Sequence, residues 1–250
     1  MSQLLAAEGA FLAARRRGVA NWQPALKALS ERTLNTDLDW DFLESIGDYA
    51  FSNLRALGAI NLPNVKSCGQ YAFRNTYSIG DVNMPELVSC EYAAFRDFLH
   101  YWTAQSEITF NLPKLQSVSQ HCFYDSLKLP SAERPTIAIN LDSCTTVGQG
   151  AFMSGGGSGA VRRLYIPRVQ TIGADAFYGF GGSAYVSRVP LVEVVVGSQE
   201  LDTGLTMASL IAMTGFPFGV SLKGRVKFCC KDGTVTYDTV QAAWVQTPYS

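Results

Sequence analysis

Apolar and polar positions alternate in short blocks that recur along the chain. In each block, the residues one and three positions before a Pro (an Asp in one block) are apolar, and an Asn or Tyr stands between them. An alternation with a period of two is typical of a short strand with one buried face, and Pro ends such a strand because it has no N–H to donate. The pattern therefore predicts a series of short strands. Their outward-facing residues are Asn61, Asn83, Asn111, Asn140 and Tyr165.

A second apolar motif follows each predicted strand. Apolar or cysteine residues stand two and five positions after the Pro, and an Ala-Phe pair (Cys-Phe in one block) follows nine and ten positions after it. We expect a short helical turn to carry this pair into the core. The phenylalanines of the motif are Phe51, Phe73, Phe95, Phe123, Phe152 and Phe177.

The spacing of the two motifs divides each repeat into a constant half and a variable half. From the Pro (or Asp142) forward to the next Phe is always ten residues, whereas from a Phe forward to the next Pro is 12, 12, 18, 19 and 15 residues. All insertions therefore fall in the same half of the unit. A repeat solenoid behaves in this way, because the stacked part of each coil cannot change length while its loops can. We predict a solenoid of short, stacked, parallel strands over residues 38–200.

The motifs resemble a known repeat. Ile-Gly-x-x-Ala-Phe, followed by x-Ile-x-Leu-Pro, is similar to the BspA-type leucine-rich repeat of bacterial surface proteins, and six units covering about two-thirds of the chain match it. The resemblance implies an extended solenoid of the leucine-rich-repeat type, which is used for adhesion or recognition. This chain departs from the pattern in its longer insertions and in Asp142, which stands where the other units have Pro.

The two ends of the solenoid are expected to be covered, because an open coil exposes both a sheet edge and the core. Residues 1–37 have helical apolar spacing, and we interpret them as an N-terminal cap or as a docking arm that attaches the chain to a larger assembly. Residues 201–250 are predicted to form a small C-terminal α/β cap, with a short helix near 205–213 and a β-hairpin around Asp232-Gly233. This hairpin is loosely similar to the tails of phage-encoded repeat proteins.

Composition and charge narrow the classes of partner. The 250 residues are 47% hydrophobic, so a folded core is expected. The net charge is −1, so sequence-independent binding to nucleic acid is not expected. No apolar run reaches the roughly 20 residues of a membrane span. Arg15, Arg16 and Arg17 follow the N-terminal apolar stretch, which argues against a secretory signal peptide. We therefore expect a phage particle (virion), or otherwise the bacterial cytoplasm or the surface by a non-classical route.

Signatures of enzymes and metal sites are missing from the sequence. It has no G-x-S-x-G, no H-E-x-x-H, no P-loop and no CxxC pair, and its histidines are His100 and His121 alone. Cys122, next to His121, stands at an inward Ala position, so we interpret it as a core residue rather than as half of a catalytic dyad. Cys68 and Cys90 occupy equivalent inward positions and are either buried thiols or a disulfide. We predict a non-enzymatic protein with no cofactor and no metal.

Two groups of residues are candidate binding sites. The first is the outward column of Asn61, Asn83, Asn111 and Asn140, with Tyr165 in the next coil, which forms either a structural amide ladder or a polar floor for a ligand. The second lies in an insertion at residues 98–102, whose aromatic character is typical of recognition hot spots. It either contacts a partner or folds back over the stack. The residues that we assign to this second site are His100, Tyr101 and Trp102.

These observations lead to two hypotheses about function. The first is a recognition or adhesion module that binds a bacterial surface glycan or protein, carried on a phage tail or another particle through the N-terminal helices. The second is a structural component of a virion or other assembly, with no external ligand. Length variation confined to one half of each repeat favours the first hypothesis, because it places variable loops on a constant support.

Overall fold

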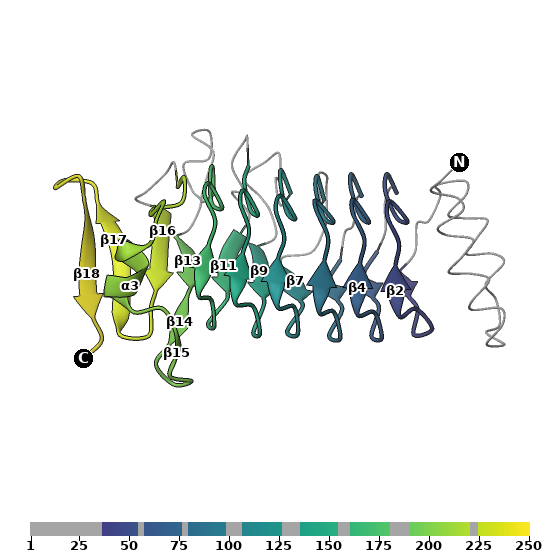
Figure 1. Ribbon diagram of the computed structural model, residues 1–250, viewed down its shortest axis with the longest axis horizontal. Coiled ribbons are helices and arrows are strands. Elements are labelled where there is room, and N and C mark those ends of the chain that lie inside the picture. The colour runs from purple at the N-terminus through teal and green to yellow at the C-terminus, as the bar shows by residue number, and fades with distance from the viewer. Residues whose placement is uncertain are drawn as a thin grey trace.

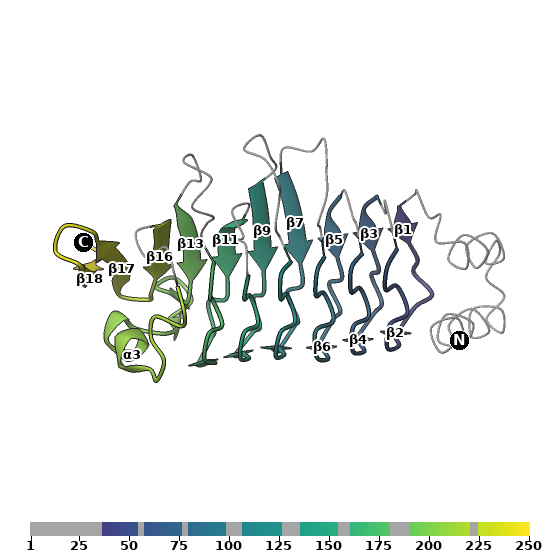
Figure 2. The same cartoon turned by 90° about the horizontal axis from the view of Figure 1, so that it is seen from above.

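The computed structural model describes residues 37–54, 58–76, 80–98, 107–126, 136–154, 161–180, 191–220 and 225–250. These residues form a repeat solenoid, whose coils follow one another along a single axis (Figures 1 and 2). Each coil contributes one strand to a long sheet and most coils contribute a second strand to a shorter sheet. The predicted series of short, stacked, parallel strands is confirmed.

The long sheet has ten strands in the order β1-β3-β5-β7-β9-β11-β13-β16-β17-β18. Neighbouring strands from β1 to β16 are parallel, as expected for successive coils. β17 is antiparallel to β16, and β18 is antiparallel to β17. The bounds of these strands are Leu38–Asp39 (β1), Ile60–Asn61 (β3), Val82–Asn83 (β5), Glu107–Asn111 (β7), Thr136–Asn140 (β9), Val161–Tyr165 (β11), Val192–Val195 (β13), Val226–Cys229 (β16), Gly233–Asp238 (β17) and Ala243–Pro248 (β18).

The shorter sheet consists of six two-residue strands, also parallel, that lie across the core from the long sheet (Figure 2). Each ends on the inward residue five positions after the Pro or Asp, so the second apolar motif is a strand as well. The bounds are Ser45–Ile46 (β2), Ser67–Cys68 (β4), Ser89–Cys90 (β6), Ser117–Val118 (β8), Thr146–Val147 (β10) and Thr171–Ile172 (β12). A separate antiparallel pair joins Gly197–Ser198 (β14) to Thr203–Gly204 (β15).

The third side of each coil consists of two linked tight turns rather than the predicted helical turn. In the first coil, Ala50 N–H donates to Gly47 O at 3.3 Å and Ser52 N–H donates to Tyr49 O at 3.0 Å. Tyr49 and Asn53, at the two corners, have positive φ values of 58° and 61°, which no α-helix contains. Alternate N–H groups bond to the next coil instead, as Phe51 N–H does to Ala72 O at 2.8 Å. Stacking thus takes the bonds that a helix would have used.

The core is built around a column of stacked phenylalanine rings. Ring centroids are 5.1 Å apart for Phe73 and Phe95, 5.2 Å for Phe95 and Phe123, and 5.2 Å for Phe123 and Phe152, with interplanar angles of 4° to 6°. Phe51 and Phe177 extend the column at its ends with slightly larger tilts. The rings repeat at the separation of the coils, because each coil supplies one Phe at the same turn. All six side chains are buried, as the sequence pattern predicted.

Insertions lengthen the strands that follow them. β7, β9 and β11 lie at the ends of the three longest Phe-to-Pro intervals, and each has five residues, whereas β3 and β5 have two. β7 and β9 pair over all five residues, from Glu107 with Thr136 to Asn111 with Asn140. The extra residues are therefore added at the beginning of the strand. The constant half of the coil keeps its register.

The C-terminal segment continues the long sheet and then leaves the repeat pattern. β16 is parallel to β13, and it forms the hairpin expected around Asp232-Gly233 with β17. Met207–Ala212 (α3) is the short helix expected near 205–213, and Thr206 with Ser209 forms its capping box. β18 was not predicted, and its Trp244 packs against Phe216 and Phe228. The expected N-terminal helices at 1–37 lie outside the described residues, apart from residue 37, and the division at residue 200 stays a prediction.

Candidate binding surface

The outward face of the long sheet carries a ladder of side-chain amides. Asn61 Nδ2 donates to Asp39 Oδ1 at 2.7 Å, Asn83 Nδ2 to Asn61 Oδ1 at 2.8 Å, and Asn111 Nδ2 to Asn83 Oδ1 at 2.8 Å. The direction of these bonds is the same in all three, so the ladder begins on the carboxylate of Asp39 and reaches Asn111. These are the bonds that a structural amide ladder requires.

The ladder leaves part of each amide available. An Asn amide has two N–H donors and an oxygen that accepts two bonds, and the ladder uses one donor and one acceptor site of Asn61 and of Asn83. The Asn61, Asn83 and Asn111 residues are half-buried, so solvent reaches part of each one. Asn140 lies next to Asn111 in the sheet, and in the following coil Tyr165 takes this column, with the Arg163 guanidinium 5.1 Å from its ring centroid. A binding role for this face stays a prediction.

The aromatic insertion is only partly within the described residues. His100, Tyr101 and Trp102 lie outside them, so their assignment as a binding site remains a prediction. Phe98 is described and is fully buried, with edge-to-face contacts to Phe73, Phe95 and Phe110. At the start of this insertion, the aromatic residue therefore belongs to the core.

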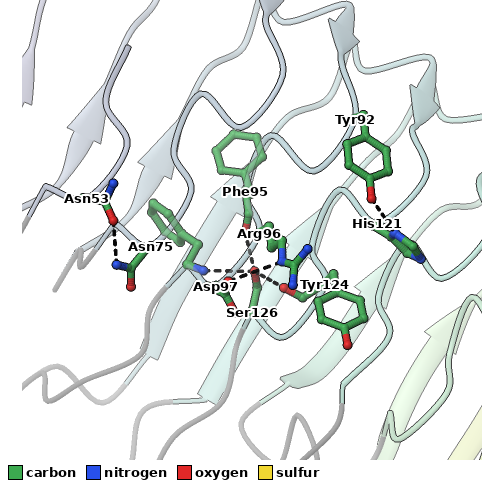
Figure 3. A network of polar contacts seen from close by, with 10 residues as sticks. Asn53, Asn75, Tyr92, Phe95, Arg96, Asp97, His121, Tyr124 and Ser126 are labelled. Carbon is green, nitrogen blue, oxygen red and sulfur yellow. Dashed lines mark hydrogen bonds and ion pairs between the residues drawn. The ribbon is translucent and has the colours of Figure 1, made fainter. Parts of the chain in front are cut away.

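A second aromatic column lies on the turn side of the solenoid, and we call it the tyrosine–histidine row. It consists of the half-buried side chains of Tyr49, Tyr71, Tyr92 and His121, one from each of four successive coils. Tyr49 and Tyr71 are stacked, with centroids 5.0 Å apart and an interplanar angle of 18°. Tyr71 and Tyr92 meet edge to face at 5.4 Å and 80°. Figure 3 shows the Tyr92 hydroxyl directed at His121, with 3.1 Å between Tyr92 Oη and His121 Nδ1.

A one-residue shift explains why the row changes orientation at Tyr92. The corner position with positive φ is filled by Tyr49, Tyr71, Ala93 and His121 in the four coils. Tyr92 stands one residue before the corner, at the position that Gln70 and Gln120 occupy in the coils on either side. Its ring therefore joins the row from a repeat position that holds Gln in the neighbouring coils.

Two arginines lie beside the row, and one of them is paired with a carboxylate. Arg74 lies 5.4 Å from the Tyr71 ring centroid, and Arg96 lies 4.6 Å from the Tyr124 ring centroid, both in cation–π geometry. Arg96 Nε is also 3.4 Å from Asp97 Oδ2 (Figure 3). Burial, followed by the charge of Arg96, lowers the pKa of His121 below its usual value, so its imidazole is mainly uncharged at neutral pH. The row is therefore a largely neutral surface.

The turns that hold the row are secured by side-chain bonds behind it. Asn75 Nδ2 donates to Asn53 Oδ1 at 2.8 Å, and Thr76 Oγ1 donates to Phe51 O at 2.6 Å. The buried Ser126 hydroxyl donates to Phe95 O and accepts from Phe98 N–H at 3.1 Å (Figure 3). These bonds link one coil to the next, so the rings of the row are held on an ordered support.

The structure separates His121 from Cys122. Cys122 is fully buried in the core, where burial and the neighbouring Cys90 raise the pKa of its thiol well above the usual value. His121 instead faces Tyr92 on the surface. A Cys-His dyad needs the two side chains in contact and a thiol that ionises easily, and neither condition holds here. Within the part of the chain that the structure describes, no cluster of His, Cys, Asp and Glu could hold a metal ion.

The cysteines are expected to resist alkylation in the folded protein. Cys68, Cys90, Cys122, Cys144 and Cys230 are buried free thiols, and burial raises the pKa of Cys144 to about 11 and that of Cys230 to about 12. A raised pKa leaves less thiolate at pH 8, and the thiolate is the species that reacts. With iodoacetamide at pH 8, mass spectrometry should find the half-buried Cys229 modified first and all six cysteines modified only after unfolding. Fast alkylation of Cys122 in the folded protein would contradict the buried column.

The repeat pattern by itself does not single out the tyrosine–histidine row. The signal was present, because Tyr49 and Tyr71 begin the Tyr-Ala-Phe triplets that define the repeat. Tyr92 was harder to find, since it stands one residue before that position. Only the packing of adjacent coils brings its ring into line with the others.

Two stretches of the chain, residues 34–155 and 100–186, match the model of the BspA type leucine rich repeat region, with six copies. No curated protein and no solved structure matches the chain. No helix in the described residues is long and apolar enough to cross a membrane.

Proposed function

Because the chain belongs to the BspA-type leucine-rich-repeat family, we propose that it is a non-enzymatic recognition module that binds a surface glycan or protein. Repeats of this family generally serve as binding or scaffold modules. One observation carries the proposal: the Asn column of the long sheet and the strands of the short sheet stay aligned from coil to coil, while the insertions before β7, β9 and β11 vary in length. Variable loops on a constant, stacked support are the usual arrangement of a recognition surface.

Three surfaces are available for this function. The first is the insertion that contains His100, Tyr101 and Trp102, and the second is the outward face of Asn61, Asn83, Asn111, Asn140 and Tyr165. The third is the tyrosine–histidine row. The two described surfaces are rigid, since their side chains are already ordered by bonds or ring contacts between coils. Preordered side chains lose little entropy on binding, which favours affinity.

Binding to bacterial cells tests the proposal. We expect the purified, labelled protein to co-sediment saturably with at least one species in a panel of bacteria. Trp102→Ala and Tyr101→Ala test the insertion, Asn83→Ala tests the amide face, and Tyr178→Ala, an exposed residue outside all three surfaces, is the matched control. Truncation of an aromatic hot spot should weaken binding about thirty-fold, while the control should change it little.

The outcomes are distinct. Weakened binding only in the Trp102 and Tyr101 variants places recognition on the insertion, and weakened binding in the Asn83 variant places it on the amide face. Saturable binding that every one of these variants retains leaves the tyrosine–histidine row as the remaining surface. Absence of binding to every species tested contradicts the recognition module and favours the second candidate.

The second candidate is a structural component of an assembly, and the open edge of β18 favours it. Among the described residues, β18 pairs with β17 alone, and its six residues, Ala243–Pro248, carry no charged side chain. Charged residues are a common device that keeps a sheet edge from pairing with another chain. In this candidate, attachment through residues 1–37 and a place in a phage virion are further predictions. Co-purification of the chain with assembled particles, rather than with cells, would support them.

A further inference from the structure

We propose that the tyrosine–histidine row is a binding site for an extended, uncharged β-1,4-linked polysaccharide, one sugar ring lying over each coil. The inference rests on the proposed recognition function and names its ligand class and site. It is carried by the orientation of the rings, by the amide side chains beside them, by the near-neutral surface and by the separation of the coils.

The orientation of Tyr92 provides a stacking surface. Tyr49 and Tyr71 lie in adjacent coils and stack face to face, so their planes lie across the solenoid axis. The contact of Tyr71 with Tyr92 at 80° turns the Tyr92 ring so that its plane runs along the axis. His121 meets Tyr92 at 63°, so neither neighbour lies parallel to the Tyr92 ring. The C–H groups of a sugar ring can pack against the face of an aromatic ring. Tyr supplies such a contact area at low entropic cost.

Hydrogen-bonding groups flank the ring on both sides. Gln70 and Gln120 are exposed and stand immediately before the corner position in the coils on either side of Tyr92. Each side-chain amide both donates and accepts, as do the Tyr hydroxyls, and a sugar hydroxyl requires both. Partial burial, followed by the neighbouring Tyr71, raises the pKa of the Tyr92 hydroxyl, so it stays protonated near neutral pH.

The charges near the row argue against an anionic ligand. Arg96 is paired with Asp97, and Arg74 lies over the Tyr71 ring, while the exposed Asp48 and Glu91 place carboxylates close to the same column. Asp48 Oδ1 already accepts from Gln70 N–H at 2.8 Å. Recognition of phosphate or carboxylate depends on a concentration of free cationic donors. The surface instead offers aromatic rings and neutral amides, which suit a polyhydroxylated, uncharged chain.

The repeat of the solenoid matches the repeat of the ligand. Equivalent rings in adjacent coils are 5.0 Å apart for Tyr49 and Tyr71, and 5.1 to 5.2 Å apart in the phenylalanine column. Successive sugar rings of an extended β-1,4-linked chain have nearly the same separation. An extended peptide does not share this period, since its residues rise by about 3.3 Å each. A polysaccharide that lies along the axis can therefore place one sugar ring over each coil.

The row has a defined end at Gly150, which takes the corner position after His121. A Cβ at this position would lie 2.5 Å from His121 Cδ2, so the imidazole occupies the space of the missing side chain. The next corner residue, Asp175, carries a carboxylate in place of a ring. The site therefore spans the coils from Tyr49 to His121, and a short oligosaccharide is sufficient to fill it.

Isothermal titration calorimetry of the full chain tests the proposal, with cellohexaose and the hexasaccharide of β-1,4-linked N-acetylglucosamine as probes. We expect at least one hexasaccharide to bind, and Tyr92→Ala to weaken its binding about thirty-fold. Tyr92→Phe, which keeps the ring contacts and removes the hydroxyl, should weaken it about fivefold. Gln120→Ala changes an exposed residue beside the row and leaves the core intact, and it should also weaken binding. The control variant Tyr178→Ala should bind the saccharide as the unmodified chain does.

Thermal unfolding of each variant separates binding from folding. If the row were only structural, Tyr92→Ala would lower the unfolding temperature, and Tyr92→Phe and Gln120→Ala would leave saccharide binding unchanged, which overturns the proposal. The proposal is also overturned if neither hexasaccharide binds at millimolar concentration, whether or not the protein binds to bacterial cells. In that case, binding to cells that is lost when the cells are treated with protease would keep the recognition function and assign a protein partner to it.

Discussion

Phe95→Ala is expected to destabilise the protein more than any other single truncation in the described core. Phe95 stacks between Phe73 and Phe123, at 5.1 and 5.2 Å, and also meets Phe98 and Phe110 edge to face. Removing it opens a cavity lined by rings that are fixed by the coils on both sides and cannot collapse. The free energy of unfolding should fall by about 3–5 kcal/mol, and the unfolding temperature by about 10 °C.

Denaturant unfolding followed by circular dichroism measures this effect. Phe95→Leu should lose less than the alanine variant, because it leaves a smaller cavity. Tyr178→Ala removes an aromatic side chain that is 45% exposed, and its cost should be below about 1 kcal/mol. If Phe95→Ala cost as little as the Tyr178 variant, the phenylalanine column would not be the close-packed element that the ring distances indicate.

Gly179→Ala is expected to have the second large effect. Gly179 has a φ of +70°, and a Cβ at this position would lie 1.9 Å from the backbone oxygen of Ser154 in the preceding coil. The backbone conformation alone costs an L-residue about 1–2 kcal/mol. The clash adds to this cost, because neither backbone can move without breaking the bond from Ser154 N–H to Tyr178 O, which is 2.8 Å long.

Gly215→Ala is the matched control for this substitution. Gly215 has a φ of +88°, but the nearest heavy atom to a Cβ there is Phe218 Cδ1 at 4.0 Å. Both variants therefore suffer the conformational strain, and only the Gly179 variant suffers the clash. Urea unfolding should show that Gly179→Ala loses at least about 2 kcal/mol more than Gly215→Ala. Equal losses would mean that the coils can separate locally at Ser154.

Gly179 also illustrates a limit of repeat alignment. The equivalent corner is filled by Asn53, Asn75, Asp97 and Asp125, all with positive φ, so the repeat pattern alone permits Asn at residue 179. The close approach of the Ser154 carbonyl forbids it. The distance between two backbones from different coils is not a property of either segment of sequence.

The sequence by itself determined the parts of this protein that repeat. The period-two strands, the inward phenylalanines, the constant and variable halves and the hairpin at Asp232-Gly233 follow from local spacing, because each coil must bury the same face against its neighbours. The family followed from the same motifs. Local sequence patterns also predicted the C-terminal helix near 205–213.

Tertiary structure decided what adjacent coils do to one another. Stacking between coils took the hydrogen bonds of the expected helical turn and turned it into two tight turns with residues at positive φ. It placed Phe98 in the core, separated His121 from Cys122, and brought Tyr92 into line with Tyr71 from a different position in its repeat. Such contacts join residues about one coil apart, and a sequence pattern shows that they recur without showing which side chains meet. The candidate saccharide site is of this kind, because it exists only in the stacked coils.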